Sequence, residues 1–153
     1  MSEVPRVGEP APDLTLPDTH GTPVSLSGLR GTPVALVFYP FAFSGICTGE
    51  LCELRDNLAA FDDAGVRLVG ISCDPMFTQR AFAEREGYTF DLLSDFWPHG
   101  AASRAYGVFD EATGHAVRGS FLVDAQGVLR WSVVNPRGQA RPLTAYREAL
   151  SRL

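Results

Sequence analysis

Long apolar runs and clusters of positive charge are both missing from this chain of 153 residues. The longest apolar stretch, around Val34 to Phe43, is well short of the roughly 20 residues that a membrane-spanning helix needs. Arginines never form a run, and the formal net charge is −5, which argues against partners such as nucleic acid or an anionic membrane. The N-terminal segment lacks the apolar core of a secretory signal, so we expect a cytoplasmic protein.

Motifs for metals and nucleotides are absent as well. His20, His99 and His115 are scattered, and neither C-x-x-C nor H-E-x-x-H occurs, so we expect no metal site. The glycines form neither G-x-G-x-x-G nor a P-loop, so we expect no bound nucleotide and no other cofactor. The three cysteines are an odd number and do not suggest a disulfide framework, which again fits a reducing cytoplasm.

The composition is that of one soluble globular domain, with 45% hydrophobic and 20% charged residues. A chain of this length can bury one good core but is too short for two ordinary domains. It contains no internal repeat, linker or low-complexity tract. We therefore expect a single domain over residues 1–153.

The most informative stretch begins with seven almost wholly apolar residues, Val34 to Pro40. Their β-branched and aromatic character predicts a strand buried on both faces, as in the centre of a parallel sheet. Pro40 ends the strand because proline has no N–H for the ladder. An apolar stripe with helical spacing then predicts a helix from about Ser44 to Ala64, closed by Gly65. The stripe consists of Leu51, Leu54, Leu58 and Phe61.

Cys47 falls in the first turn of this predicted helix. Ser44 is the expected N-cap, its hydroxyl accepting from the N–H of Cys47. First-turn N–H groups have no intrahelical acceptor and the helix dipole is positive there, so both favour the nucleophilic thiolate over the thiol. The alternative is a buried cysteine acting as a small hydrophobic side chain. The helix N-terminus and the loop before it favour the reactive thiolate.

The rest of the chain predicts an α/β protein with a thioredoxin-like fold. Residues 66–72 form a second strand, so strand, helix and strand make a parallel βαβ unit with a right-handed crossover. Residues 14–17 and 24–26 form an added N-terminal β-hairpin. The central mixed sheet is flanked by helices. The remaining elements are helices over 78–86, 101–106 and 144–153, and strands over 90–93, 108–110, 116–123 and 128–134.

Pro40, Ser44 and Cys47 fill the pattern P-x-x-x-[ST]-x-x-C, which resembles the active-site motif of peroxiredoxins. The resemblance extends over nearly the whole chain. Residues 7–16 resemble the start of the family's N-terminal hairpin, and Arg118 to Asp124 resemble the strand that carries its active-site arginine. Two further segments, 43–47 and 93–100, look closest to the AhpE-type branch, which uses one cysteine.

The resemblance implies a thiol peroxidase without a prosthetic group. The Cys47 thiolate would attack the O–O bond of hydrogen peroxide or an alkyl hydroperoxide, with peroxynitrite as a further candidate, and become a sulfenic acid. The Cys47 N–H, the Ser44 hydroxyl and the Arg118 guanidinium would donate along the line of attack. Pro40 would keep water off the sulfur. Without the family pattern, Ser44 would be only a helix cap and Arg118 a solvated strand residue.

Two residues after Cys47 have open roles. Glu50 is either an exposed helix carboxylate or, as often in the family, the partner that orients the arginine. Cys52 stands at the +5 spacing of the resolving cysteine in the Q-type branch, also called bacterioferritin-comigratory protein. The one-cysteine branch does not need it, so Cys52 is either a resolving cysteine or a passive helix residue. Cys73 follows the second strand and is expected to be structural.

Four aromatic residues, Phe41, Phe43, Phe96 and Trp97, could form an apolar rim that suits alkyl hydroperoxides, although core packing is the expected role for at least two. Trp97 is expected in a loop near the active site. The family further implies a homodimer and a thiol reductant, either thioredoxin or a glutaredoxin-like mycoredoxin with a low-molecular-weight thiol. Two other functions on this fold remain open, a thiol–disulfide oxidoreductase and a redox sensor or holdase.

Overall fold

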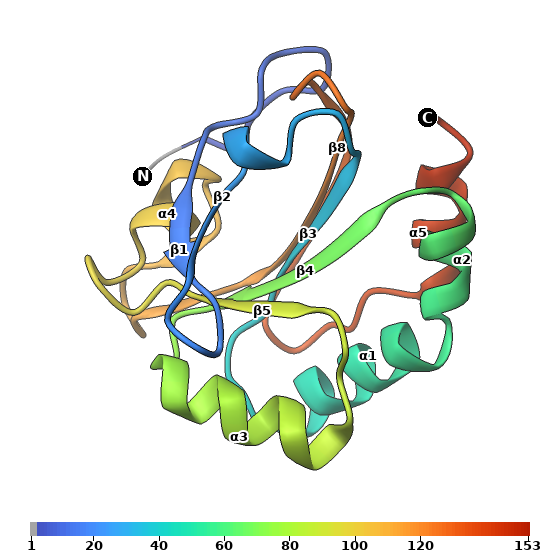
Figure 1. Ribbon diagram of the computed structural model, residues 1–153. Coiled ribbons are helices and arrows are strands. Elements are labelled where there is room, and N and C mark those ends of the chain that lie inside the picture. The colour runs from blue at the N-terminus through green and yellow to red at the C-terminus, as the bar shows by residue number, and fades with distance from the viewer. Residues whose placement is uncertain (1–2) are drawn as a thin grey trace.

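A five-stranded mixed sheet organises the computed structural model, which describes residues 3–153 (Figure 1). The strand order is β5-β4-β3-β8-β9. β3, β4 and β5 are parallel, whereas β8 is antiparallel to both β3 and β9. The expected parallel βαβ unit is therefore confirmed. The strands are β3 (Val34–Phe38), β4 (Arg67–Ser72), β5 (Asp91–Ser94), β8 (Arg118–Val123) and β9 (Leu129–Asn135).

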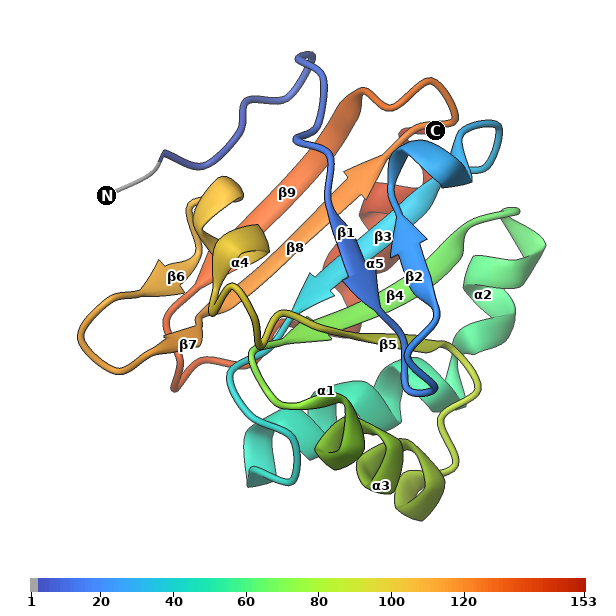
Figure 2. The same cartoon turned by 60° about the vertical axis from the view of Figure 1, so that its left-hand side comes forward.

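Helices cover one face of the sheet, and the N-terminal hairpin with one short helix covers the other (Figures 1 and 2). The first layer contains α1 (Gly45–Asp56), α2 (Leu58–Asp63), α3 (Met76–Glu86) and α5 (Leu143–Leu150). The second contains β1 (Thr15–Pro17), β2 (Pro23–Ser25) and α4 (Ala101–Ala105), beside the small hairpin of β6 (Phe109–Asp110) and β7 (His115–Ala116). A 3-10 turn, η1 (Ser27–Leu29), follows β2. Within residues 3–153, no helix combines the length and the apolar character needed to cross a membrane.

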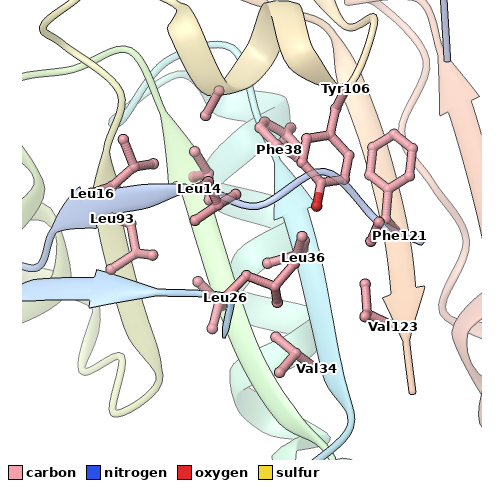
Figure 3. Close-up of a cluster of buried hydrophobic side chains, with 14 of the residues drawn as sticks. Leu14, Leu16, Leu26, Val34, Leu36, Phe38, Leu93, Tyr106, Phe121 and Val123 are labelled. Carbon is pink, nitrogen blue, oxygen red and sulfur yellow. The ribbon is translucent and has the colours of Figure 1, made fainter. Parts of the chain in front are cut away.

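The central strand β3 supplies both cores because its side chains alternate between the two faces of the sheet. Val34, Leu36 and Phe38 belong to the core under the hairpin and α4 (Figure 3). Ala35, Val37 and Tyr39 belong to the core under the helices. All five residues of the strand are buried, which explains the unbroken apolar run in the sequence. The α/β class, the mixed sheet and the added hairpin are as predicted.

Two predicted elements are each divided in the structure. The prediction of a single helix over 44–64 is wrong, because the helix is interrupted at Asn57 (φ −118°, ψ 20°), which lies between α1 and α2. The Asn57 side chain donates to the carbonyl of Glu53 at 2.8 Å, a local bond that competes with the helical pattern. The strand expected over 116–123 is divided into β7 and β8, because β7 pairs with β6 whereas β8 pairs with β3 and β9.

The sheet brings the start of β8 to the end of β3. The two strands are antiparallel, and Val37 of β3 pairs with Ser120 of β8. The start of β8 therefore lies at the edge where β3 ends and the loop to α1 begins (Figure 2), and Arg118 is the first residue of β8. β4 is parallel to β3, so the loop after β4 leaves from the same edge. The loop after Pro40 and the start of β8 at Arg118, 78 residues apart in the sequence, thus meet through the sheet register.

Candidate active site

A strained turn leads from β3 into α1. The Ser44 N–H donates to the Phe41 carbonyl at 3.4 Å, and Phe43 has a φ of 68°, in the left-handed region that non-glycine residues seldom occupy. Ser44 itself is extended, and its carbonyl accepts the Thr48 N–H at 2.8 Å. The helix starts at Gly45, which confirms that Cys47 lies in its first turn.

The Ser44 side chain differs from the expectation. Ser44 is at the N-cap position, but its hydroxyl makes no capping bond, and the buried Oγ has no hydrogen-bond partner in residues 3–153. The predicted bond from the Cys47 N–H to this hydroxyl is therefore wrong. The helix start is formed by the Ser44 carbonyl instead, and the side chain forms part of a pocket wall. A hydroxyl left unpaired inside a protein is costly unless something else binds it.

Cys47 is fully buried, at 0% exposure, in the core that also contains Leu51 and Leu54. It carries no disulfide. Burial by itself would fit a small hydrophobic side chain equally well. The surrounding hydrogen-bond donors therefore decide between the two interpretations.

Glu50 and Arg118 form a buried ion pair, so the open role of Glu50 is resolved in favour of the arginine partner. The Arg118 Nη1 donates to Glu50 Oε1 at 2.5 Å, and the two side chains are only 2% and 5% exposed. The Arg118 Nε donates to the Arg137 carbonyl at 2.7 Å. Arg118 Nη2 has no hydrogen-bond partner in the described part of the chain. Two of its three nitrogens thus hold the guanidinium in place, and the third is free to donate.

A second arginine, Arg141, completes this network and was missed by the sequence analysis. Its guanidinium donates to both Glu50 oxygens, at 2.9 and 3.0 Å, and its backbone N–H donates to Oε2 at 2.6 Å. Its Nη1 also donates to the carbonyls of Phe38 and Gly119, at 2.7 and 2.9 Å. Arg141 belongs to the irregular segment between β9 and α5, where no periodicity or motif marks a buried charge.

The charge of Glu50 is stabilised by these contacts. Burial alone would raise the pKa of its carboxyl group, but the hydrogen bonds and positive charge of Arg141, aided by Arg118, hold the pKa below its usual value. Glu50 is therefore ionised at neutral pH, and one carboxylate serves two buried guanidinium groups.

A pocket of about 240 Å³ lies over the start of α1. Ser44 and Arg118 line it together, so the two groups expected to bind substrate are brought to one place. The Cys47 N–H next to it has no acceptor in residues 3–153. These three groups can therefore donate hydrogen bonds to a small molecule on which negative charge develops. The lining residues are Pro40, Phe41, Ser44, Gly45, Ile46, Arg118, Arg137 and Gly138.

The predicted aromatic rim is only partly correct. Phe41 lines the pocket, but Phe43, Phe96 and Trp97 do not. All four are 41–80% exposed, so the expectation that at least two pack in the core is wrong. Trp97 lines a different pocket, beside Asp13 and Ala101, and its predicted place near the active site is not supported. The loop after β5 packs toward the N-terminal hairpin and α4 rather than toward the start of α1.

The other two cysteines have different surroundings. Cys52 is half-buried, and its Sγ lies 3.5 Å from Glu86 Oε2 and 3.4 Å from the Tyr88 hydroxyl. Cys73 is buried beside Asp95 and Ser103, and burial raises the pKa of its thiol to about 11. A thiol with so high a pKa is a poor nucleophile, which agrees with a structural role. In the described residues, no three His, Cys, Asp or Glu side chains are gathered to hold a metal ion.

The chain is similar in sequence and in fold to known proteins. Residues 7–132 match the model of the AhpC/TSA family. The chain is 47% identical over 149 residues to alkyl hydroperoxide reductase E of Mycobacterium tuberculosis, with 97% of each chain covered. It is 38% identical over 128 residues to peroxiredoxin Bcp of Escherichia coli, covering 80% of this chain and 81% of the relative. A crystal structure of peroxidoxin BcpB from Mycobacterium tuberculosis superposes with a TM-score of 0.83, at 31% identity over 96% of this chain and 95% of that one.

The shared role of Glu50 predicts its effect on stability. Glu50→Ala leaves two buried guanidinium groups without their carboxylate, so the free energy of unfolding should fall by about 3 kcal/mol or more. Glu53→Ala, three residues later on the exposed side of the same helix, should change it by less than about 0.5 kcal/mol. Urea unfolding of both variants measures the difference. Equal effects would show that Glu50 is not the centre of the network.

Proposed function

The chain belongs to the AhpC/TSA family and is a peroxiredoxin, a thiol-dependent peroxidase similar to alkyl hydroperoxide reductase E, and we propose that Cys47 is the residue that reduces the peroxide. The observation that carries this assignment is the pocket over the first turn of α1, where the Ser44 hydroxyl and Arg118 Nη2 both lack partners among residues 3–153.

The reaction that this site supports is attack by the Cys47 thiolate on one oxygen of the O–O bond. A sulfur–oxygen bond forms as the O–O bond breaks, so the sulfur is oxidised by two electrons to a sulfenic acid. The leaving oxygen departs as hydroxide or alkoxide and takes a proton to become water or an alcohol. Negative charge moves from sulfur to oxygen during this step, where the Ser44 hydroxyl, Arg118 and the Cys47 N–H can stabilise it.

Pro40 and Glu50 support the reacting groups. Pro40 lines the pocket without an N–H of its own and, by our proposal, shields the sulfur from water. Glu50 holds Arg118 through the ion pair at 2.5 Å, so the guanidinium does not have to be ordered when substrate arrives. Preordered donors are the usual source of such electrostatic catalysis.

The pocket wall suggests the range of substrates. Phe41 and Ile46 are apolar, whereas Ser44 and Arg118 are polar. We propose hydrogen peroxide and alkyl hydroperoxides as substrates, with peroxynitrite as a further one. An alkyl group would lie against Phe41 and Ile46 while the peroxide oxygens reach the donors.

A thiol reductant is needed to return Cys47 to its starting state. We propose thioredoxin, or a glutaredoxin-like mycoredoxin with a low-molecular-weight thiol, acting in the cytoplasm, where the cycle can begin from a free thiol. A homodimer is proposed as well. Exposed apolar side chains in the loop before α1 and in its first turn, including Phe41, Phe43 and Ile46, would be covered in such a dimer.

Replacing Cys47 tests the assignment directly. Cys47→Ser keeps the size of the side chain but gives a hydroxyl that hardly ionises near neutral pH, so peroxide reduction should be abolished while far-UV circular dichroism is unchanged. Cys73→Ser is the matched control and should retain the rate of the parent protein. Peroxide consumption that survives in Cys47→Ser, measured with hydrogen peroxide and a thiol reductant, would end this proposal.

We further propose that Cys52 resolves the sulfenic acid as an intramolecular disulfide. Both cysteines lie in the continuous helix α1, where five residues place the Cα atoms roughly 8.6 Å apart on different faces. A disulfide needs Cα atoms within about 7 Å, so the first turns of α1 must unwind. Gly45 and Gly49 favour unwinding, because each lowers helix stability by about 1 kcal/mol relative to alanine. A Cβ at either position would meet no neighbouring atom, so close packing does not require these glycines.

Contacts of Cys52 oppose this unwinding. Its Sγ is close to Glu86 and Tyr88, and the Tyr88 hydroxyl lies 3.4 Å from the Thr48 carbonyl, which ties α1 to the end of α3. Cys52 is half-buried and packs against the core under the helices. These contacts are few and involve weak sulfur bonds, so they should delay resolution without preventing it.

One equivalent of hydrogen peroxide should convert the parent protein to a 47–52 disulfide with some loss of helical signal. Cys52→Ser should react with the first equivalent as fast as the parent, but further peroxide should oxidise Cys47 to sulfinic acid. Mass spectrometry of the intact and digested protein distinguishes these products. A long-lived sulfenic acid in the parent, without the disulfide, would mean that Cys52 is passive and that an external thiol resolves Cys47.

A further inference from the structure

A chain of buried and partly buried hydrogen bonds reaches the active-site turn from the opposite side to the arginines. Asp74 follows β4, and its Oδ2 accepts the Ala42 N–H at 2.8 Å. Ala42 is the second residue of the turn Phe41–Ser44, directly before the strained Phe43. Asp74 is therefore bonded to the one loop that carries the pocket residues Phe41 and Ser44.

The carboxylate of Asp74 is itself held by buried polar side chains. The Ser72 hydroxyl donates to the same Oδ2 at 2.7 Å, and the Gln79 Nε2 donates to the Ser72 Oγ at 2.9 Å. Gln79 also donates to the Leu93 carbonyl of β5 at 2.8 Å. Ser72 and Gln79 are both fully buried. The path Gln79 to Ser72 to Asp74 to Ala42 thus links the rigid sheet to the turn.

The backbone at Phe43 explains why the turn needs this support. A left-handed conformation at a non-glycine residue costs of order 1–3 kcal/mol and persists only where the surroundings enforce it. The bond within the turn, from Ser44 N–H to Phe41 carbonyl, is long at 3.4 Å. A hydrogen bond to a carboxylate is about twice as strong as one between neutral groups. The bond from Ala42 to Asp74 is therefore stronger than the neutral bond within the turn.

We propose that Asp74 is a positioning residue for peroxide reduction, which holds the turn Phe41–Ser44 so that the Ser44 hydroxyl faces the pocket beside Arg118. Asp74 touches neither the peroxide nor the sulfur and acts only through the Ala42 N–H. The inference rests on the proposed roles of Cys47 and Ser44, and it adds a second support for the site besides Glu50.

Two rates measured on Asp74→Ala, the oxidation and the alkylation of Cys47, distinguish a positioning role from a general loss of stability. Loss of the carboxylate lets the turn relax, so the oxidation of Cys47 by hydrogen peroxide should slow by about 10-fold to 10²-fold, the scale of a misplacement near 1 Å. The same relaxation uncovers the fully buried Cys47, so its alkylation by iodoacetamide should become faster. Stopped-flow oxidation and peptide-resolved mass spectrometry measure the two rates. Asp74→Asn keeps an acceptor oxygen for Ala42 and should recover most of the peroxide rate.

Asp91→Ala is the matched control, because Asp91 begins β5 at the other end of the sheet and pairs with Arg67. It should change neither rate. Ser72→Ala removes the hydroxyl that holds the carboxylate and should show both changes to a smaller extent, which provides a test if Asp74→Ala does not fold. The proposal is overturned if Asp74→Ala and Ser72→Ala oxidise at the parent rate, or if the oxidation and alkylation rates fall together. An inert parent protein would instead contradict the proposed function itself.

Discussion

The sharing of one buried carboxylate between two arginines is the constraint on which the rest of the active site depends. Glu50 is ionised because Arg141 and Arg118 surround it, and neither guanidinium could be buried without it. Such a triad is costly to desolvate, so hydrophobic residues of similar volume could stabilise the fold at least as well. Within residues 3–153 it leaves the Nη2 of Arg118, a residue that lines the pocket, without a hydrogen-bond partner.

The triad also connects three parts of the chain that do not adjoin in sequence. Glu50 comes from the second turn of α1, Arg118 from the first residue of β8, and Arg141 from the segment before α5. Arg141 additionally binds the carbonyls of Phe38 and Gly119, at the end of β3 and the start of β8. Asp74 holds the turn between β3 and α1 from the other direction. Cys47 is thus placed in a first turn that is supported on both sides, and the glycines at 45 and 49 each lower helix stability by about 1 kcal/mol relative to alanine.

The sequence predicted the parts of this structure that follow from local pattern. The apolar run at residues 34–40 indicated the central strand, and Ser44 with the apolar stripe that begins at Leu51 indicated the helix after it. Contacts between segments far apart in the sequence were harder to predict. Arg141 lies 91 residues from Glu50 and stands in an irregular segment, so neither periodicity nor motif could reveal it. The interruption of the helix at Asn57 depends on one side chain that competes with the backbone for a hydrogen bond. At Ser44, the carbonyl oxygen rather than the hydroxyl oxygen accepts the hydrogen bond at the helix start. Both are decided by geometry rather than by residue type.

The central claim is that Arg118, fixed by Glu50 and the Arg137 carbonyl, donates to the peroxide during attack by Cys47. The most direct measurement is the stopped-flow rate at which hydrogen peroxide oxidises Cys47 in Arg118→Ala. We predict a loss of about 10²-fold or more, the scale for one preordered donor, while Arg130→Ala on the exposed side of β9 keeps the parent rate. An Arg118→Ala variant that remains folded and oxidises as fast as the parent protein would contradict this account.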